Sequence, residues 1–84
     1  MTKKISILVV DDEESVRDSL YNWFKEDGYR VECAENAKMA LSILESENFD
    51  IILADIKMPG MDGLEMLRRI KALKKSSCLF LLFS

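Results

Sequence analysis

Three aspartates are the side chains of this 84-residue chain best placed to do chemistry. Asp11 and Asp12 directly follow the apolar run 5–10, and Asp55 directly follows a second apolar run, 51–54. Short apolar runs of this kind are typical of strands buried on both faces of a parallel sheet. An acid at the carboxyl end of such a strand lies where open α/β sheets place their chemistry. Taken alone, Asp55 is equally well explained as a helix cap or a solvated loop residue.

The same arrangement, an apolar run followed directly by an acid, occurs twice, and this favours a shared pocket. If the two runs are neighbouring parallel strands, ~4.8 Å apart, their carboxyl ends bring Asp11, Asp12 and Asp55 together. Three clustered carboxylates repel one another unless a cation neutralises them or their pKa values rise. Mg²⁺ suits such a pocket, because it needs only one or two carboxylates and keeps several waters that a phosphate can replace.

Two motifs carry a resemblance to a known family. Residues 9–13 read Val-Val-Asp-Asp-Glu, and residues 53–63 read Leu-Ala-Asp-Ile-Lys-Met-Pro-Gly-Met-Asp-Gly. Together they resemble the receiver domain of two-component response regulators, and the resemblance covers the whole chain in order. It implies a flavodoxin-like (CheY-like) α/β fold, an open parallel sheet with strand order 2-1-3-4 and three helices, incomplete relative to the family.

The resemblance also implies a role for each site residue. Asp55 would be the phosphoacceptor, which receives a phosphoryl group from a sensor histidine kinase or phosphotransfer protein. Asp12 would bind Mg²⁺ directly, Asp11 through water, and Asp55 and the main-chain carbonyl of Lys57 would complete the metal site. Ser84 matches the switch hydroxyl at the end of the fourth strand. Such a domain is not an enzyme beyond catalysing its own phosphorylation and dephosphorylation.

The chain departs from the family pattern at its end. Family members continue for another helix, a fifth strand that carries a lysine, and a last helix, whereas this sequence stops at Ser84. We therefore expect residues 1–84 to be a receiver truncated after its fourth strand, a natural short form or a fragment, with impaired phosphorylation. The fourth strand would be an exposed apolar edge, a hazard that natural proteins avoid. We therefore expect a homodimer, formed by strand-to-strand pairing across the fourth strand or by exchange of a terminal element.

The elements that must position the site alternate between strands and helices. Apolar periodicity predicts strands over 4–10, 29–34, 50–54 and 78–83, and helices over 14–27, 37–46 and 63–74. This alternation implies right-handed crossovers between parallel strands. Asn36 is a good N-cap for the second helix, Gly28 suits the residue after the first, and Asp62 with Glu65 resembles a capping box for the third.

Each helix has an apolar stripe that predicts its buried face. The predicted inward residues are Val16, Leu20, Trp23 and Phe24 in the first helix, Ala37, Ala40, Leu41 and Leu44 in the second, and Leu64, Leu67 and Ile70 in the third, with Met66 or Leu73 at the border. The end of the third helix is basic, which fits a solvated face that complements the helix dipole or a docking patch for an acidic partner; the residues are Arg68, Arg69, Lys71, Lys74 and Lys75.

Composition narrows the class of protein. Apolar residues make up 49% and charged residues 32%, as in a soluble globular domain, and no apolar run is long enough to span a bilayer. A net charge of −3 gives no reason to expect nucleic-acid binding by this segment. With no histidine and two separated cysteines, Cys33 and Cys78, a structural zinc site is excluded. Free thiols of this kind indicate a reducing, cytoplasmic location.

Two other classes of function compete with a receiver. One is a non-phosphorylated dimerisation or interaction module derived from a receiver, in which the acids are relics. The other is a small phosphohydrolase with an aspartyl nucleophile, but those enzymes typically carry a second acid two residues after the nucleophile, and this position holds Lys57.

Overall fold

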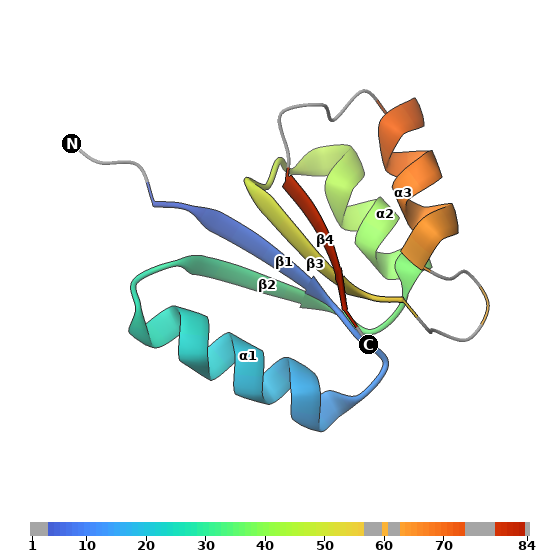
Figure 1. Cartoon of the computed structure of the whole chain (residues 1–84). Coiled ribbons are helices and arrows are strands. Elements are labelled where there is room, and N and C mark those ends of the chain that lie inside the picture. Colours follow the sequence, from blue (N-terminus) through green and yellow to red (C-terminus); the bar gives the residue numbers. More distant parts are fainter. Residues whose placement is uncertain (1–3, 57–59, 61–62, 74–78, 84) are drawn as a thin grey trace.

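The computed structural model describes residues 4–56, 60, 63–73 and 79–83. Strands and helices alternate along the chain in the predicted order (Figure 1), and their bounds are β1 Ser6–Val10, α1 Glu14–Glu26, β2 Arg30–Ala34, α2 Ala37–Ser46, β3 Ile51–Asp55, α3 Gly63–Ala72 and β4 Leu79–Phe83. The bounds of α2 match the prediction at both ends. Strand β3 begins and ends one residue later than predicted, so that Asp55 is its last residue rather than the first residue after it.

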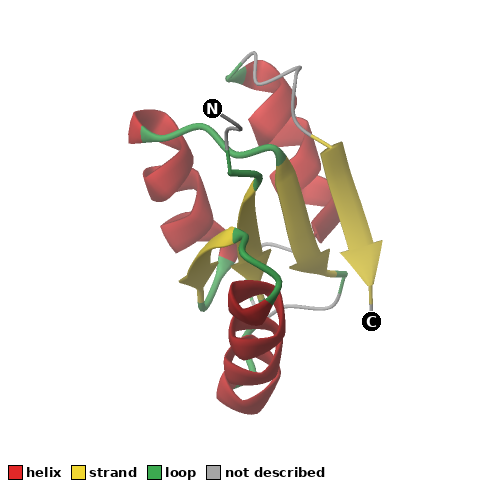
Figure 2. Ribbon diagram, turned by 90° about the vertical axis from the view of Figure 1, so that its left-hand side faces the viewer, coloured by secondary structure: helices red, strands yellow, loops and turns green. Residues whose placement is uncertain are grey.

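The four strands form one parallel sheet with the order β2-β1-β3-β4. Successive residues of a strand point to opposite faces, and both faces of β1 are buried. Figures 1 and 2 show α1 on one face of the sheet and α2 with α3 on the other. The predicted flavodoxin-like architecture with strand order 2-1-3-4 is therefore confirmed.

The face under α2 and α3 holds the larger core cluster. Leu8, Val10, Ile52 and Ala54 from the strands pack there against buried residues of the two helices, which are Ala37, Ala40, Leu44, Met66 and Ile70. The predicted buried face of α2 is confirmed, with Leu41 partly buried at its edge.

The prediction for α3 was wrong at Leu64. Its side chain is 55% exposed, whereas Met66, predicted only as a border residue, is fully buried. Met66 and Ile70 are four residues apart and share the inward face, and Leu64 lies about 160° around the helix from Met66. Which apolar residues of α3 are buried therefore follows from the direction in which the helix faces the sheet.

The other face of the sheet is covered by α1, which packs mainly over β1 and β2. Leu20 and Phe24 pack there against Ile7, Val9 and Val31. The prediction that Trp23 belongs to the core was wrong, because its side chain is 70% exposed. Trp23 lies about 100° around the helix from Phe24, to one side of the face through which Leu20 and Phe24 pack on the sheet.

Two predicted helix ends are confirmed. The Met39 N–H donates to Oδ1 of Asn36 at 2.8 Å, so Asn36 caps α2. Beyond α1, Gly28 has a φ of 89°, a left-handed conformation that favours glycine. None of the helices in the described part of the chain has the length and apolar character that a membrane-spanning helix needs.

Candidate functional site

Strand register brings the three aspartates to one end of the sheet. Val10 pairs with Ala34 of β2 on one side and with Ala54 of β3 on the other. Asp11 and Asp55 each follow a member of the second pair, so they lie at the same level on neighbouring strands. One carboxylate oxygen each from Asp11, Asp12 and Asp55 lies within 4.8 Å of the other two.

The loop from β1 to α1 holds Asp11 by hydrogen bonds to its main-chain and side-chain groups. The Asp11 N–H donates to the carbonyl of Ala34 at 3.1 Å, which continues the ladder between β1 and β2. Its Oδ1 accepts from the Glu13 N–H at 2.9 Å, and its carbonyl oxygen accepts from the Arg17 guanidinium at 2.8 Å. Asp11 is only 2% exposed.

The other two acids are more accessible to solvent. Asp12 is exposed and Asp55 is half-buried. The pocket therefore combines a buried carboxylate at its base with two carboxylates that a solvent-borne ion or phosphoryl group can approach.

Burial raises the pKa of the Asp11 carboxyl above its ordinary value. The negative charges of Asp55 and Asp12 and a side-chain hydrogen bond with Asp12 raise this pKa further, while the hydrogen bond from the Glu13 N–H opposes them. Ionisation of Asp11 is thus less favourable in this pocket than in a freely solvated aspartate, and nearby positive charge would offset the difference. A bound cation would supply that charge.

The donor set fits Mg²⁺. All three side chains offer carboxylate oxygens, the hard ligands that Mg²⁺ prefers, and the two accessible acids leave room for the waters that this ion retains. Two further predicted site residues, Lys57 and Ser84, lie outside the described residues. So do Asp62 of the predicted capping box and Cys78, whereas Cys33 is a free, partly buried thiol.

Arg17 contacts the site through the Asp11 carbonyl, and no sequence pattern predicted this contact. Its signal in the sequence is weak, because a cation in the first turns of an amphipathic helix is ordinarily a solvated residue. Only the path of the loop, which brings the Asp11 carbonyl back toward α1, places the two groups within hydrogen-bond distance.

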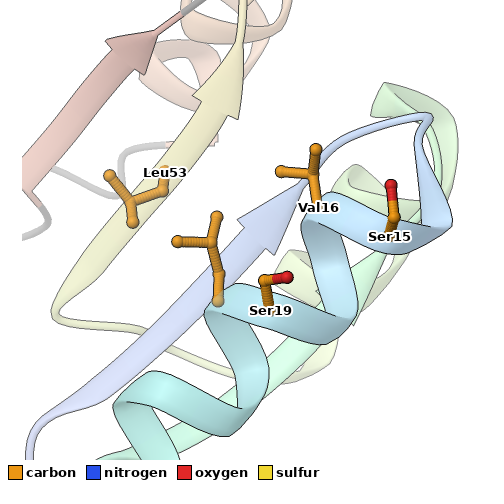
Figure 3. Close-up of a pocket in the computed structure, with 5 residues that line it drawn as sticks. Ser15, Val16, Ser19 and Leu53 are labelled. Carbon is orange, nitrogen blue, oxygen red and sulfur yellow. The ribbon is translucent and has the colours of Figure 1, made fainter.

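An apolar groove lies beside the site, between α1 and β3. Figure 3 shows Leu53 of β3 facing α1 across this groove, with Val16, Ser15 and Ser19 on the helix side, and Leu20 completes the lining. The groove exists because α1 packs mainly over the other half of the sheet.

Comparison with known proteins identifies the family. Residues 7–83 match the model of the response regulator receiver domain. The chain therefore belongs to the response regulator receiver family, as the motifs around Asp11 and Asp55 predicted.

Relatives and solved structures agree with this assignment. The chain is 41% identical over 70 residues to sporulation initiation phosphotransferase F of Bacillus subtilis, covering 83% of this chain and 56% of that protein. It is 38% identical over 80 residues to the transcriptional regulatory protein ResD of the same organism, covering 95% of this chain and 33% of that protein. The chain thus spans about half of the first relative and a third of the second.

Solved structures of receivers superpose closely on this fold. The chemotaxis protein CheY4 of Vibrio cholerae matches with a TM-score of 0.92 at 28% identity, over 95% of this chain and 68% of that one. A response regulator receiver protein from Pseudomonas putida matches with a TM-score of 0.92 at 25% identity, over 100% of this chain and 70% of that one.

Proposed function

We propose that this chain receives a phosphoryl group on Asp55 from the phosphohistidine of a sensor kinase or phosphotransfer protein. The observation that carries the proposal is the position of Asp55, at the carboxyl end of β3 with Asp11 and Asp12 within 4.8 Å. Membership of the receiver family supports the same reaction class. The two cysteines, Cys33 and Cys78, lie in separate apolar segments of the sequence, which favours free thiols and a cytoplasmic location.

The Asp55 side chain can react without being activated by another residue. A carboxylate oxygen of Asp55 attacks phosphorus, the bond from phosphorus to the histidine nitrogen breaks, and the nitrogen leaves with the bonding electron pair. The product is an acyl phosphate. An ionised carboxylate is already a nucleophile, so no general base is needed, and alignment with charge neutralisation provides most of the catalysis.

The acids beside Asp55 would hold the ion that this chemistry needs. We propose that Asp12 binds Mg²⁺ directly and Asp11 through water, with Asp55 and the main-chain carbonyl of Lys57 as further ligands. When bound, Mg²⁺ neutralises negative charge on the carboxylates and the phosphoryl oxygens. The hydroxyl of Ser84 is proposed to contact the phosphoryl group in the active state.

A phosphorylation assay tests the proposal. The protein is incubated with Mg²⁺ and acetyl phosphate, and intact mass is expected to rise by one phosphoryl group. The same rise is expected in Asp18→Asn, a control on the exposed surface of α1, and no rise is expected in Asp55→Asn. An unchanged mass in the parent protein, or an equal gain in Asp55→Asn, would overturn the phosphoacceptor role.

A second candidate function is self-association through β4, independent of phosphorylation. This strand lies at the edge of the sheet and has the uncharged sequence Leu-Phe-Leu-Leu-Phe. Leu79 is 56% exposed and Leu81 43% exposed. An apolar edge strand without a charged residue is a template for pairing with an identical strand, so we propose a second copy of this chain as its partner.

A further inference from the structure

Arg17 connects α1 to the acidic pocket through the main chain of Asp11. The guanidinium donates to the Asp11 carbonyl oxygen at 2.8 Å, and the Arg17 side chain is half-buried. The Arg17 N–H also donates to the carbonyl of Glu13 at 3.1 Å, in the first turn of the helix. The same residue therefore ties both ends of the short β1–α1 loop to the helix.

We propose that Arg17 is a positioning residue, which holds this loop so that Asp11 and Asp12 stay beside Asp55 in the geometry that binds a divalent cation. This inference rests on the proposed function for its purpose, but the contact itself does not. The three carboxylates repel one another, and this repulsion favours displacement of the loop from β3. A hydrogen bond from a charged donor is roughly twice as strong as a neutral one and opposes that displacement.

Helix α1 is a firm anchor for this bond. Leu20 and Phe24, one and two turns further along, pack against the sheet. Arg17 is therefore carried by a helix whose position is set by the core, while the carbonyl that it binds belongs to a loop. The hydrogen bond from Arg17 therefore opposes movement of the loop under the repulsion between the acids.

Two effects of Arg17 on cation binding have opposite signs. A guanidinium near the pocket repels Mg²⁺, so its charge alone predicts tighter metal binding when Arg17 is replaced. Loss of positioning predicts weaker binding instead. The direction of the change therefore distinguishes a positioning residue from a nearby charge.

The test measures Mg²⁺ affinity by titration calorimetry of the parent chain and two variants. Arg17→Met keeps most of the side-chain stem but removes the donor, and is expected to weaken Mg²⁺ binding roughly tenfold, as is typical when a partner of a ligand residue is lost. Arg17→Lys restores a charged donor and is expected to recover most of the affinity. Arg69→Met, which removes a cation paired with Glu65 on α3 at 3.4 Å, is the matched control and should bind as the parent does.

A second readout needs no metal. Amide hydrogen exchange at Glu13, whose N–H is bonded to Asp11, is expected to quicken in metal-free Arg17→Met and to return toward the parent rate in Arg17→Lys. Arg17→Leu, which also lacks a donor, replaces the Met variant if that variant does not fold.

The outcomes separate this inference from the proposed function. Tighter or unchanged Mg²⁺ binding in Arg17→Met, or unchanged exchange at Glu13, overturns the positioning role even if Asp55 is phosphorylated. A parent protein that binds no Mg²⁺ overturns the metal-binding purpose, and with it the proposed metal site. Faster amide exchange at Glu13 in Arg17→Met would in that case still show that Arg17 holds the β1–α1 loop in place.

Discussion

At the scale of single residues, Asp11 connects the acidic pocket to the stability of the fold. Its pKa is raised in the folded protein by burial, and then by the charges of Asp55 and Asp12. Between the ordinary pKa and the raised one, the folded state binds more protons than the unfolded state, so the free energy of unfolding falls as pH increases through that window. Ionised Asp11 is thus a destabilising group in the metal-free protein.

Asp11→Asn should therefore stabilise the metal-free protein at neutral pH, by about 1 kcal/mol, the energy of two like charges ~4 Å apart in a water-like medium. Asparagine keeps an oxygen that can accept from the Glu13 N–H. The same variant should weaken Mg²⁺ binding, because a carboxylate is lost. Urea denaturation from pH 4 to pH 7 with and without Mg²⁺ measures both effects.

Asp18→Asn, on the exposed surface of α1, serves as the control for a change of net charge. If Asp11→Asn destabilised the metal-free protein as pH rises, ionised Asp11 would not be a destabilising group in the folded state. The expected pattern is that the stability gap between parent and Asn variant widens as Asp11 ionises and closes again when Mg²⁺ is added.

Two adjacent aromatic residues of helix α1 lie in different environments, one at the core and the other in solvent. Phe24 packs on the sheet and meets Tyr29 edge-on with ring centroids 6.0 Å apart, whereas Trp23 is largely exposed. Phe24→Ala should reduce the free energy of unfolding by about 2 kcal/mol, somewhat below the range for fully buried aromatics. Trp23→Ala should change it by less than about 0.5 kcal/mol.

Urea denaturation followed by far-ultraviolet circular dichroism compares the two variants without relying on Trp23 fluorescence. Equal losses of stability would mean that Trp23 contacts the core in solution. In that case the sequence-based interpretation of the α1 stripe would be right at this position.

At the scale of the whole molecule, we expect the apolar strand β4 to determine whether copies associate. Leu81→Lys places a charge on the exposed edge strand, a device by which natural sheets prevent edge pairing. We expect sedimentation equilibrium to show a dimer for the parent chain and a monomer for this variant. Leu73→Lys, at an exposed position at the end of α3, is the control and should leave the dimer intact.

The same measurement distinguishes the two proposed functions. A dimer that is indifferent to Mg²⁺ and acetyl phosphate favours an interaction module, and a dimer whose affinity changes with them favours a phosphorylation-linked receiver. A parent chain that stays monomeric at the highest concentration tested would exclude self-association through β4.

Local patterns were sufficient to predict the order of the elements and the end of the sheet that carries the acids. Helix α2 was predicted to the residue because Asn36 supplies a cap and Ala37, Ala40 and Leu44 repeat at helical spacing. The cluster of Asp11, Asp12 and Asp55 was predictable because each acid ends an apolar run, and parallel strands bring their carboxyl ends to one edge.

Three features depended on tertiary structure. Trp23 and Leu64 belong to apolar stripes, but whether a stripe residue is buried depends on which side of the helix faces the sheet. Asp55 joined β3 because its backbone pairs with Phe83 of β4, a partner distant in sequence. The bond from Arg17 to the Asp11 carbonyl exists only because the loop folds back on the helix, and a periodic pattern contains no information about that path.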